Sequence, residues 1–383
     1  MQDRRISSGS NHLPGGIDLH YNNPAMETEY LPTYRVDETY ERNYAAGPAF
    51  SGPFPSVPAT PSKLFLGLPV RSRLGVSAGL LLNAKWVECY ARLGFDLLTY
   101  KTVRSSHRPC YPLPNWVRVD LSRGLPNDPD EPVYTIDPPV VRGDDVSWSV
   151  CFGMPSMAPE VWRQDIRDAK SHLREGQLLL VSVVGTPPAE GSLQDLADDF
   201  ARCAAWARES GADIVEANFS CPNVCSAEGQ IYQDIHAASL VSERMRQAIG
   251  RCPLLIKTGN FGQNEQVRPF LHAVAESADG VVLVNGIQRR VLRPDGTPAF
   301  GPHERAGILG RAIHADGVRL VADAVDWIRK DSLPLVVAGV GGVFNANDAA
   351  DFFNAGAEAV FLGGSPMVRP TIAIEMKCSR PDF

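Results

Sequence analysis

Long apolar runs are missing from this sequence: none approaches the ~18 consecutive residues that a helix needs to cross a bilayer. The amino terminus has no basic and apolar leader, so we expect neither secretion nor a membrane partner. Positive charge is also in deficit, with 37 Lys and Arg against 44 Asp and Glu and a net charge of -7. Because binding to a phosphate backbone needs a concentrated basic face, nucleic acid is not expected as a partner.

Cysteines in metal-binding arrangements are absent as well. The chain has eight cysteines, but none shows the paired spacing of a zinc site, and the isolated pair Cys221 and Cys225 does not signal an iron–sulfur cluster. We therefore predict no metal site and expect a cytoplasmic protein with reduced thiols. The motif Gly-x-x-x-x-Gly-Lys-[Ser/Thr] is also missing, which disfavours a nucleotide hydrolase.

The first 62 residues differ in composition from the rest of the chain. Pro, Gly, Ser, Asn and charged residues dominate there, and no helical periodicity is visible. Low apolar content predicts an extended or partly disordered arm over residues 1–62. Five of the ten tyrosines fall in this segment, which leaves open an arm that packs on the rest of the chain or on a second subunit.

From residue 63 a repeating pattern of strands and helices begins. The strands are continuous apolar runs, which is typical of a parallel sheet buried on both faces. We expect eight of them, over residues 74–79, 95–103, 178–185, 211–215, 253–259, 279–286, 334–340 and 359–364. With helices between them, they predict an α/β fold, a (β/α)8 TIM barrel over residues 63–383. Residues 104–162 are too long and too rich in Pro and Trp for one helix, which predicts a β-rich insertion over the active-site face.

Polar side chains gather where these strands end, which is where the active site of such a barrel lies. They are Lys101, Asn218, Cys221, Asn223, Lys257 and Asn285. A cysteine between two amides suits recognition of a planar ring of N–H and C=O groups, with the thiol placed to move a proton. Each residue also has an ordinary structural role: the cysteine as a small buried hydrophobe, the asparagines as turn caps, and the lysines as snorkelling side chains.

The last two strands end in glycines, at Gly341-Gly342 and at Gly363-Gly364-Ser365. Glycines allow backbone N–H groups to approach an anion closely. The loops after strands seven and eight are the usual phosphate site of this barrel, so the pair of loops predicts a phosphorylated ligand.

Several motifs together resemble one known family. They are Tyr100-Lys101-Thr102, Gly153-Met154-Pro155, Asn218-Phe219-Ser220-Cys221-Pro222-Asn223, Ile256-Lys257, Val284-Asn285, Gly341-Gly342 and Gly363-Gly364. Over about residues 74–377 the chain resembles the dihydroorotate dehydrogenase family of FMN-dependent barrels. It is also similar to the pyrimidine-reducing domain of dihydropyrimidine dehydrogenases. A cysteine in the Asn-x-Ser-Cys-Pro-Asn motif, where other members have serine, places the chain with the soluble type.

The resemblance implies FMN as cofactor and a dihydropyrimidine such as dihydroorotate as substrate. Cys221 would exchange a proton at one ring carbon while a hydride passes between the neighbouring carbon and flavin N5. Lys257 would stand near the N1 and O2 edge of the flavin and stabilise its reduced anion. The implied FMN contacts are Ala78, Gly79, Lys101, Asn218, Lys257, Gly341, Gly342, Gly363, Gly364 and Ser365. The implied substrate contacts are Lys101, Gly153, Met154, Asn218, Asn223 and Asn285.

Two positions depart from the family pattern. Val150 stands where the family usually has an asparagine that binds the pyrimidine, and Gly286 replaces the Thr or Ser expected after Asn285. Each lost polar group leaves a ligand atom unpaired, at roughly 1 to 3 kcal/mol. The sequence therefore supports the cofactor more strongly than it supports orotate as the oxidised ring.

These observations leave several functions open. The main hypothesis is an FMN oxidoreductase that acts on a dihydroorotate-type ring. One alternative keeps the flavin and changes the substrate to a non-orotate ring or enone in a specialised pathway, and another is a non-catalytic flavin-binding protein. A tRNA dihydrouridine synthase has a related cysteine loop, but the acidic balance counts against it. The electron acceptor or donor is not identified, and a homodimer is expected from the family alone.

Overall fold

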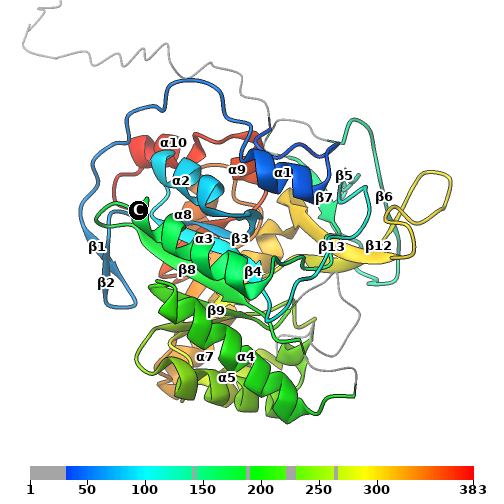
Figure 1. The fold of residues 1–383 in the computed structure, drawn as a ribbon. Coiled ribbons are helices and arrows are strands. Elements are labelled where there is room, and N and C mark those ends of the chain that lie inside the picture. Colours follow the sequence, from blue (N-terminus) through cyan, green and yellow to red (C-terminus); the bar gives the residue numbers. More distant parts are fainter. Residues whose placement is uncertain (1–31, 140–142, 144, 187–189, 221–229, 263–265) are drawn as a thin grey trace, which may run out of the picture.

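The computed structural model describes residues 32–139, 143, 145–186, 190–220, 230–262 and 266–383 (Figure 1). Its centre is a closed barrel of eight parallel strands, which confirms the predicted (β/α)8 fold. In chain order the strands are β3 (Leu74–Leu81), β4 (Leu97–Val103), β8 (Leu178–Val183), β9 (Ile214–Asn218), β10 (Leu254–Lys257), β11 (Gly280–Leu283), β14 (Val336–Val340) and β15 (Ala359–Leu362). All eight overlap or adjoin the predicted strands, because each continuous apolar run is buried on both faces.

The barrel interior is filled by side chains rather than left open. Leu97, Leu178 and Ile214, near the starts of their strands, belong to one apolar cluster that also includes Phe65. Phe65 comes from a short hairpin, β1 (Lys63–Phe65) and β2 (Leu68–Val70), which therefore closes the amino end of the barrel. Only the carboxyl end is left for a ligand.

Helices alternate with the strands and surround the barrel. They are α2 (Ala84–Arg92), α3 (Pro159–Ser171), α4 (Leu193–Glu209), α5 (Ile235–Ile249), α6 (Val267–Val274), α7 (His314–Asp331), α8 (Ala346–Asn354), α9 (Ser365–Val368) and α10 (Ile372–Ser379). Helix α4 begins at the predicted cap, where Ser192 and Asp195 form a reciprocal capping box. None of the helices in the described part of the chain is long and apolar enough to cross a membrane.

A second sheet stands beside the barrel, at the right of Figure 1. Its five strands run in the order β5 (Trp116–Arg118), β7 (Ser147–Val150), β13 (Arg305–Gly310), β12 (Ile287–Leu292) and β6 (Val133–Tyr134). Three of them come from residues 104–162, where the sequence predicts short strands. The antiparallel pair β12 and β13 follows the sixth barrel strand and was not anticipated, because β12 carries the polar run Gln288-Arg289-Arg290 and is only partly buried.

The amino-terminal segment contains a helix where no helical periodicity was recognised. Helix α1 (Tyr40–Ala46) begins after Thr39, whose side chain accepts a hydrogen bond from the Arg42 amide. Just before it, Thr33 donates from its backbone N–H to Met367 O at 2.8 Å, and its hydroxyl lies 2.6 Å from Tyr90 Oη. These contacts fix the described part of the segment against the barrel.

Candidate functional site

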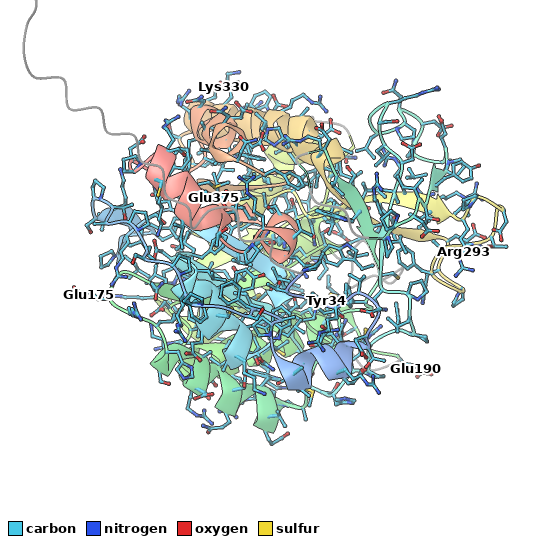
Figure 2. All side chains as sticks on the ribbon, turned by 90° about the horizontal axis from the view of Figure 1, so that it is seen from above. Tyr34, Glu175, Glu190, Arg293, Lys330 and Glu375 are labelled. Atoms are coloured by element: carbon cyan, nitrogen blue, oxygen red, sulfur yellow. The ribbon has the colours of Figure 1, made fainter. Side chains whose placement is uncertain are left out.

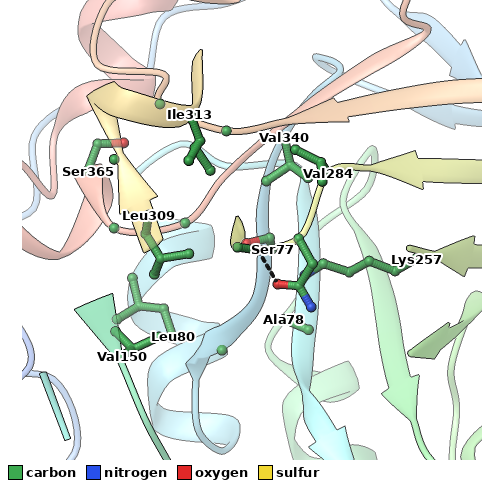
Figure 3. A pocket seen from close by; sticks show the side chains of 18 of the residues that line it. Ser77, Ala78, Leu80, Val150, Lys257, Val284, Leu309, Ile313, Val340 and Ser365 are labelled. Carbon is green, nitrogen blue, oxygen red and sulfur yellow. Dashed lines mark hydrogen bonds between the residues drawn. The ribbon is translucent and has the colours of Figure 1, made fainter. Parts of the chain in front are cut away.

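A pocket opens at the carboxyl end of the barrel strands (Figure 3). It contains about 1180 Å³ of space free of protein atoms, including its open mouth. Of the predicted site residues, the following line it: Ala78, Gly79, Lys101, Met154, Asn218, Lys257, Asn285, Gly341, Gly342, Gly363, Gly364 and Ser365. Gly153 does not line it but adjoins Met154, which does. Cys221 and Asn223 lie outside the described residues.

The two lysines are buried at the pocket and do not reach bulk water. Lys257 ends β10 with 3% of its surface exposed, and Figure 3 shows its side chain extending from that strand toward the middle of the pocket. Lys101 on β4 is 9% exposed, and its ammonium lies 5.6 Å from the ring centre of Tyr40 and 5.4 Å from that of Phe152. The snorkelling interpretation is therefore wrong for both, and the pocket holds two buried cationic side chains.

Asn218, at the end of β9, has its amide orientation fixed by three contacts. Its Oδ1 accepts from the Ser220 amide at 3.2 Å, and its Nδ2 donates to Thr102 Oγ1 at 3.3 Å. The same nitrogen lies 3.8 Å from Met154 Sδ. A fixed amide presents a defined donor and acceptor to a ring bound above it.

Asn285 follows β11 and is held by the backbone around it. Its Nδ2 donates to Ser220 O at 2.6 Å, and its Oδ1 accepts from the Gly286 amide at 2.9 Å. A Cβ at Gly286 would lie 2.9 Å from a Leu309 methyl carbon and 3.1 Å from Ile308 O. Strand β13 therefore occupies the space that a Thr or Ser side chain would need, which explains the departure from the family pattern.

The Gly153-Met154 turn carries Met154 into the pocket in a left-handed conformation. The φ angles are 74° at Gly153 and 53° at Met154. A Cβ at Gly153 would meet the Tyr111 ring at 2.6 Å, so the position requires glycine. Arg104, which is fully buried, donates from Nε to Met154 O at 3.2 Å and supports the turn from below.

The two glycine loops line the pocket with backbone, and we call them the phosphate cradle. Gly342 has a φ of 61°, and a Cβ there would lie 2.7 Å from both Gly310 O and His314 Cβ. A Cβ at Gly364 would lie 2.8 Å from the Trp148 ring. Neither position has room for a side chain, and both glycines line the pocket, which suits close approach of an anion to the backbone.

The pocket also has an apolar wall that sequence reasoning missed. In Figure 3, Leu80, Val150 and Leu309 gather on one side of it. Tyr34 and Trp116 also line the pocket, with their ring centres 6.5 Å apart. Figure 2 marks Tyr34 near helix α1, and its side chain is buried. The tyrosine-rich composition of residues 1–62 was the only sequence signal for this contribution.

Three of the described cysteines, Cys89, Cys110 and Cys203, have thiols that burial keeps protonated. Burial raises the pKa of the Cys110 thiol to about 11, although Lys101 acts in the opposite direction. Burial likewise raises the pKa of Cys89 to about 12 and that of Cys203 still further. Each of these three stays a neutral thiol at ordinary pH, which makes it a poor base for the proton transfer predicted of Cys221.

One cluster has the residue types of a metal site. His314, Asp348 and Asp351 bring their ligand atoms within 4.8 Å of one another. Arg311, however, donates to both carboxylate oxygens of Asp348 at 2.9 and 2.8 Å. An ion pair with the arginine accounts for this cluster.

Comparison with known proteins points to one family. Residues 153–376 match the family described as Dihydroorotate dehydrogenase. The protein named Dihydroorotate dehydrogenase from Dictyostelium discoideum is 32% identical over 359 residues, which cover 90% of this chain and 96% of that protein. The catalytic subunit of Dihydroorotate dehydrogenase B (NAD(+)) from Caldicellulosiruptor saccharolyticus is 28% identical over 166 residues, covering 43% of this chain and 53% of that subunit.

A solved structure shares the fold. The DHODH of Eimeria tenella, crystallised in complex with ferulenol, superposes with a TM-score of 0.64 and covers 82% of each chain. Its sequence identity to this chain is 17%, so the likeness supports the barrel architecture alone.

Proposed function

The chain belongs to the dihydroorotate dehydrogenase family, and from this premise we propose that it is an FMN-dependent oxidoreductase. The proposed reaction interconverts a dihydropyrimidine, such as dihydroorotate, and its oxidised ring. The observation that carries the proposal is the pocket that gathers two buried lysines, two oriented asparagines and both glycine loops. FMN, when bound, supplies the two-electron acceptor for the hydride that leaves the ring.

The described residues fit this cofactor at both of its ends. The cradle at Gly342 and Gly364 presents peptide groups where a Cβ would clash, which suits the phosphate. Lys257 places a buried cation at the floor of the pocket, which suits a flavin ring that gains negative charge on reduction. Lys101 and Asn218 line the same pocket, so they are placed to contact both the flavin and the substrate ring.

Cys221 is proposed as the acid–base group. It directly follows Ser220, whose amide is bound to Asn218 Oδ1 and whose carbonyl accepts from Asn285. The residue before the cysteine is thus held by two side chains that line the pocket. In the oxidative direction the Cys221 thiolate would take the proton from one ring carbon while the hydride leaves its neighbour.

A second candidate function has a specific observation in its favour. Val150 lines the pocket on strand β7, next to Leu309 and Trp116, so an apolar surface stands where the family has an amide. Such a wall favours a less polar ring or an enone as the substrate. A flavin-binding protein without turnover is the third candidate, and the two buried lysines argue against it, because buried cations are costly to retain without a use.

An anaerobic visible spectrum, recorded before and after addition of L-dihydroorotate, tests these candidates. A yellow protein that bleaches supports both the flavin and the pyrimidine substrate. A yellow protein that does not bleach retains the cofactor proposal and favours the second candidate. A protein that is colourless and takes up no added FMN rejects the proposed function.

The Cys221→Ala variant tests the acid–base role separately. It should bind FMN normally and lose turnover, because the proton has no acceptor while the hydride still has one. The electron acceptor can be sought with the same protein, by mixing the reduced form with fumarate, NAD or quinone and recording the return of the yellow colour. Reoxidation by none of these would point to a partner protein.

A further inference from the structure

Glu216 is a fully buried carboxyl that the proposed reaction does not yet use. It lies in the middle of β9, level with Ser182 of β8 and Leu255 of β10. Alternate residues of a strand share a face. Ile214 belongs to the interior apolar cluster and Asn218 lines the pocket, so Glu216 points into the barrel directly beneath the pocket floor.

A chain of hydrogen bonds connects Glu216 to the pocket, and its direction is defined. The Ser220 amide donates to Asn218 Oδ1, so Asn218 donates from Nδ2 to Thr102 Oγ1 at 3.3 Å. Thr102 Oγ1 lies 3.0 Å from Ser182 Oγ, and Ser182 stands level with Glu216 on the neighbouring strand, where its hydroxyl lowers the pKa of the carboxyl.

The protons in this chain fit an ionised carboxylate at its end. Thr102 already accepts from Asn218, so its own proton goes to Ser182, and the Ser182 proton goes to Glu216. A carboxylate accepts without having to donate. The order of the protons thus requires Glu216 to accept from Ser182, which a carboxylate can do with either oxygen.

Burial is the largest effect on this carboxyl and favours its neutral form, whereas the charge of Lys257 favours the ionised form. Lys257 on the neighbouring strand attracts the Glu216 carboxylate, while one carboxyl oxygen, Oε1, has no hydrogen-bond partner. Burial raises the pKa of Glu216, and Lys257 and Ser182 oppose that rise. A buried cation and a buried carboxylate each cost much less when they are paired.

We propose that Glu216 is a positioning residue, the carboxylate counter-ion of Lys257 and the anchor of the chain that orients Asn218. The inference rests on the proposed function, since its effect is felt at the bound flavin. With Glu216 ionised, the floor of the pocket carries no net charge from this pair. The reduced, anionic flavin is therefore stabilised less than by Lys257 alone, and its electrons leave more readily.

The Glu216→Gln variant of the FMN-loaded protein tests the inference. Gln has nearly the same shape but leaves the charge of Lys257 uncompensated. We expect the oxidation–reduction equilibrium of the flavin to shift at least tenfold toward the reduced form, which is about 30 mV for a two-electron couple. The measurement is an anaerobic titration against a reference dye, and an unchanged potential overturns the proposal.

The chain offers a matched control at the other end of the barrel. Glu358 precedes β15, is partly buried, and also has a buried carboxyl oxygen, Oε2, without a partner. The Glu358→Gln variant loses the same charge far from the pocket, so the flavin potential should stay at the parent value. An equal shift in both variants would show that the loss of any one negative charge causes the effect, and it would overturn the specific role of Glu216.

A second variant keeps the proposal testable if Glu216→Gln does not fold. Ser182→Ala removes only the hydroxyl that donates to the carboxylate, so the potential should rise in the same direction by a smaller amount. A potential equal to that of the parent would overturn the proposal. A parent protein that takes up no flavin would remove the proposed function and this inference together, whereas a loaded protein with unshifted variants would remove the inference alone.

Discussion

Replacing Gly342 by alanine should weaken FMN binding by a calculable amount. The φ of 61° costs a residue with a Cβ about 1–2 kcal/mol. The added carbon would also lie 2.7 Å from Gly310 O and from His314 Cβ, and neither atom is the free end of a flexible side chain. The loop must therefore move, and the backbone groups that face the phosphate move with it.

The expected loss follows from one hydrogen bond to a charged group. Such a bond is worth about 1.5–3 kcal/mol, which corresponds to roughly 10- to 150-fold in affinity. Titration of the apoprotein with FMN, followed by quenching of flavin fluorescence, measures the dissociation constant directly. The Gly342→Ala variant should need at least about tenfold more FMN for half-saturation, with unfolding in urea recorded in parallel to separate stability from binding.

The control for this prediction is Gly124→Ala. Gly124 has a comparable φ of 82°, but a Cβ added there would have no other atom within 4 Å, and the residue does not line the pocket. The variant should show the backbone cost in stability and no change in FMN affinity. If Gly342→Ala binds FMN as tightly as the parent and loses only as much stability as Gly124→Ala, the assignment of the glycine loops to the FMN phosphate is wrong.

Three further predictions concern substrate choice and stability. The Val150→Asn variant restores an amide to the pocket wall and should raise the affinity for dihydroorotate by about tenfold or more if that ring lies against β7. The measurement is KM together with kcat, and Val150→Thr serves as the size control. Lys377 is 0% exposed and lies 2.6 Å from Asp96. The Lys377→Met variant should lower the free energy of unfolding in urea by about 3–5 kcal/mol, because it leaves a buried carboxylate unpaired, and adding Asp96→Asn should recover part of that loss. Hydrogen bonds from Arg268 and His272 lower the pKa of Asp331 from 3.8 to about 2, so its contribution to stability is present above pH 3.8 and is lost as the pH falls through 2. Asp331→Asn should therefore flatten the dependence of stability on pH between those values, and an unchanged slope would contradict the assignment.

The barrel and most of the pocket could be predicted because they depend on local patterns. A strand buried on both faces must be apolar throughout, so the runs that became β8 and β14 are visible in the sequence alone. Parallel strands also bring their carboxyl ends to one face. Polar residues far apart in the chain, such as Lys101 and Lys257, could therefore be assigned to one pocket before any contact was known.

The features that escaped prediction depend on contacts between distant segments. The wall at Tyr34 exists because Thr33 is bound to Met367 and Tyr90, and no local pattern encodes those partners. Gly286 looked like a lost hydroxyl, but β13 fills the space where a side chain would stand. A missing polar group can thus report the packing of a neighbouring strand as well as a change of ligand. Both positions line the pocket, but packing against β13 accounts for Gly286, so Val150 is the stronger indication of an altered substrate.

The role of Glu216 also could not be predicted from the sequence, because it depends on residues of neighbouring strands. Glu216 lies two residues before the Asn218-Phe219-Ser220-Cys221-Pro222-Asn223 motif, yet a carboxyl inside an apolar strand carries no local sign of its partners. Its partners come from β8, which places Ser182 level with it, and from β10, whose Lys257 acts on its charge. In the proposed arrangement both neighbours act on the same carboxyl from different strands, so the electrostatic effect of Lys257 and the orientation of Asn218 both depend on Glu216. The pocket floor therefore has to be treated as one coupled unit, and single substitutions in it should not add.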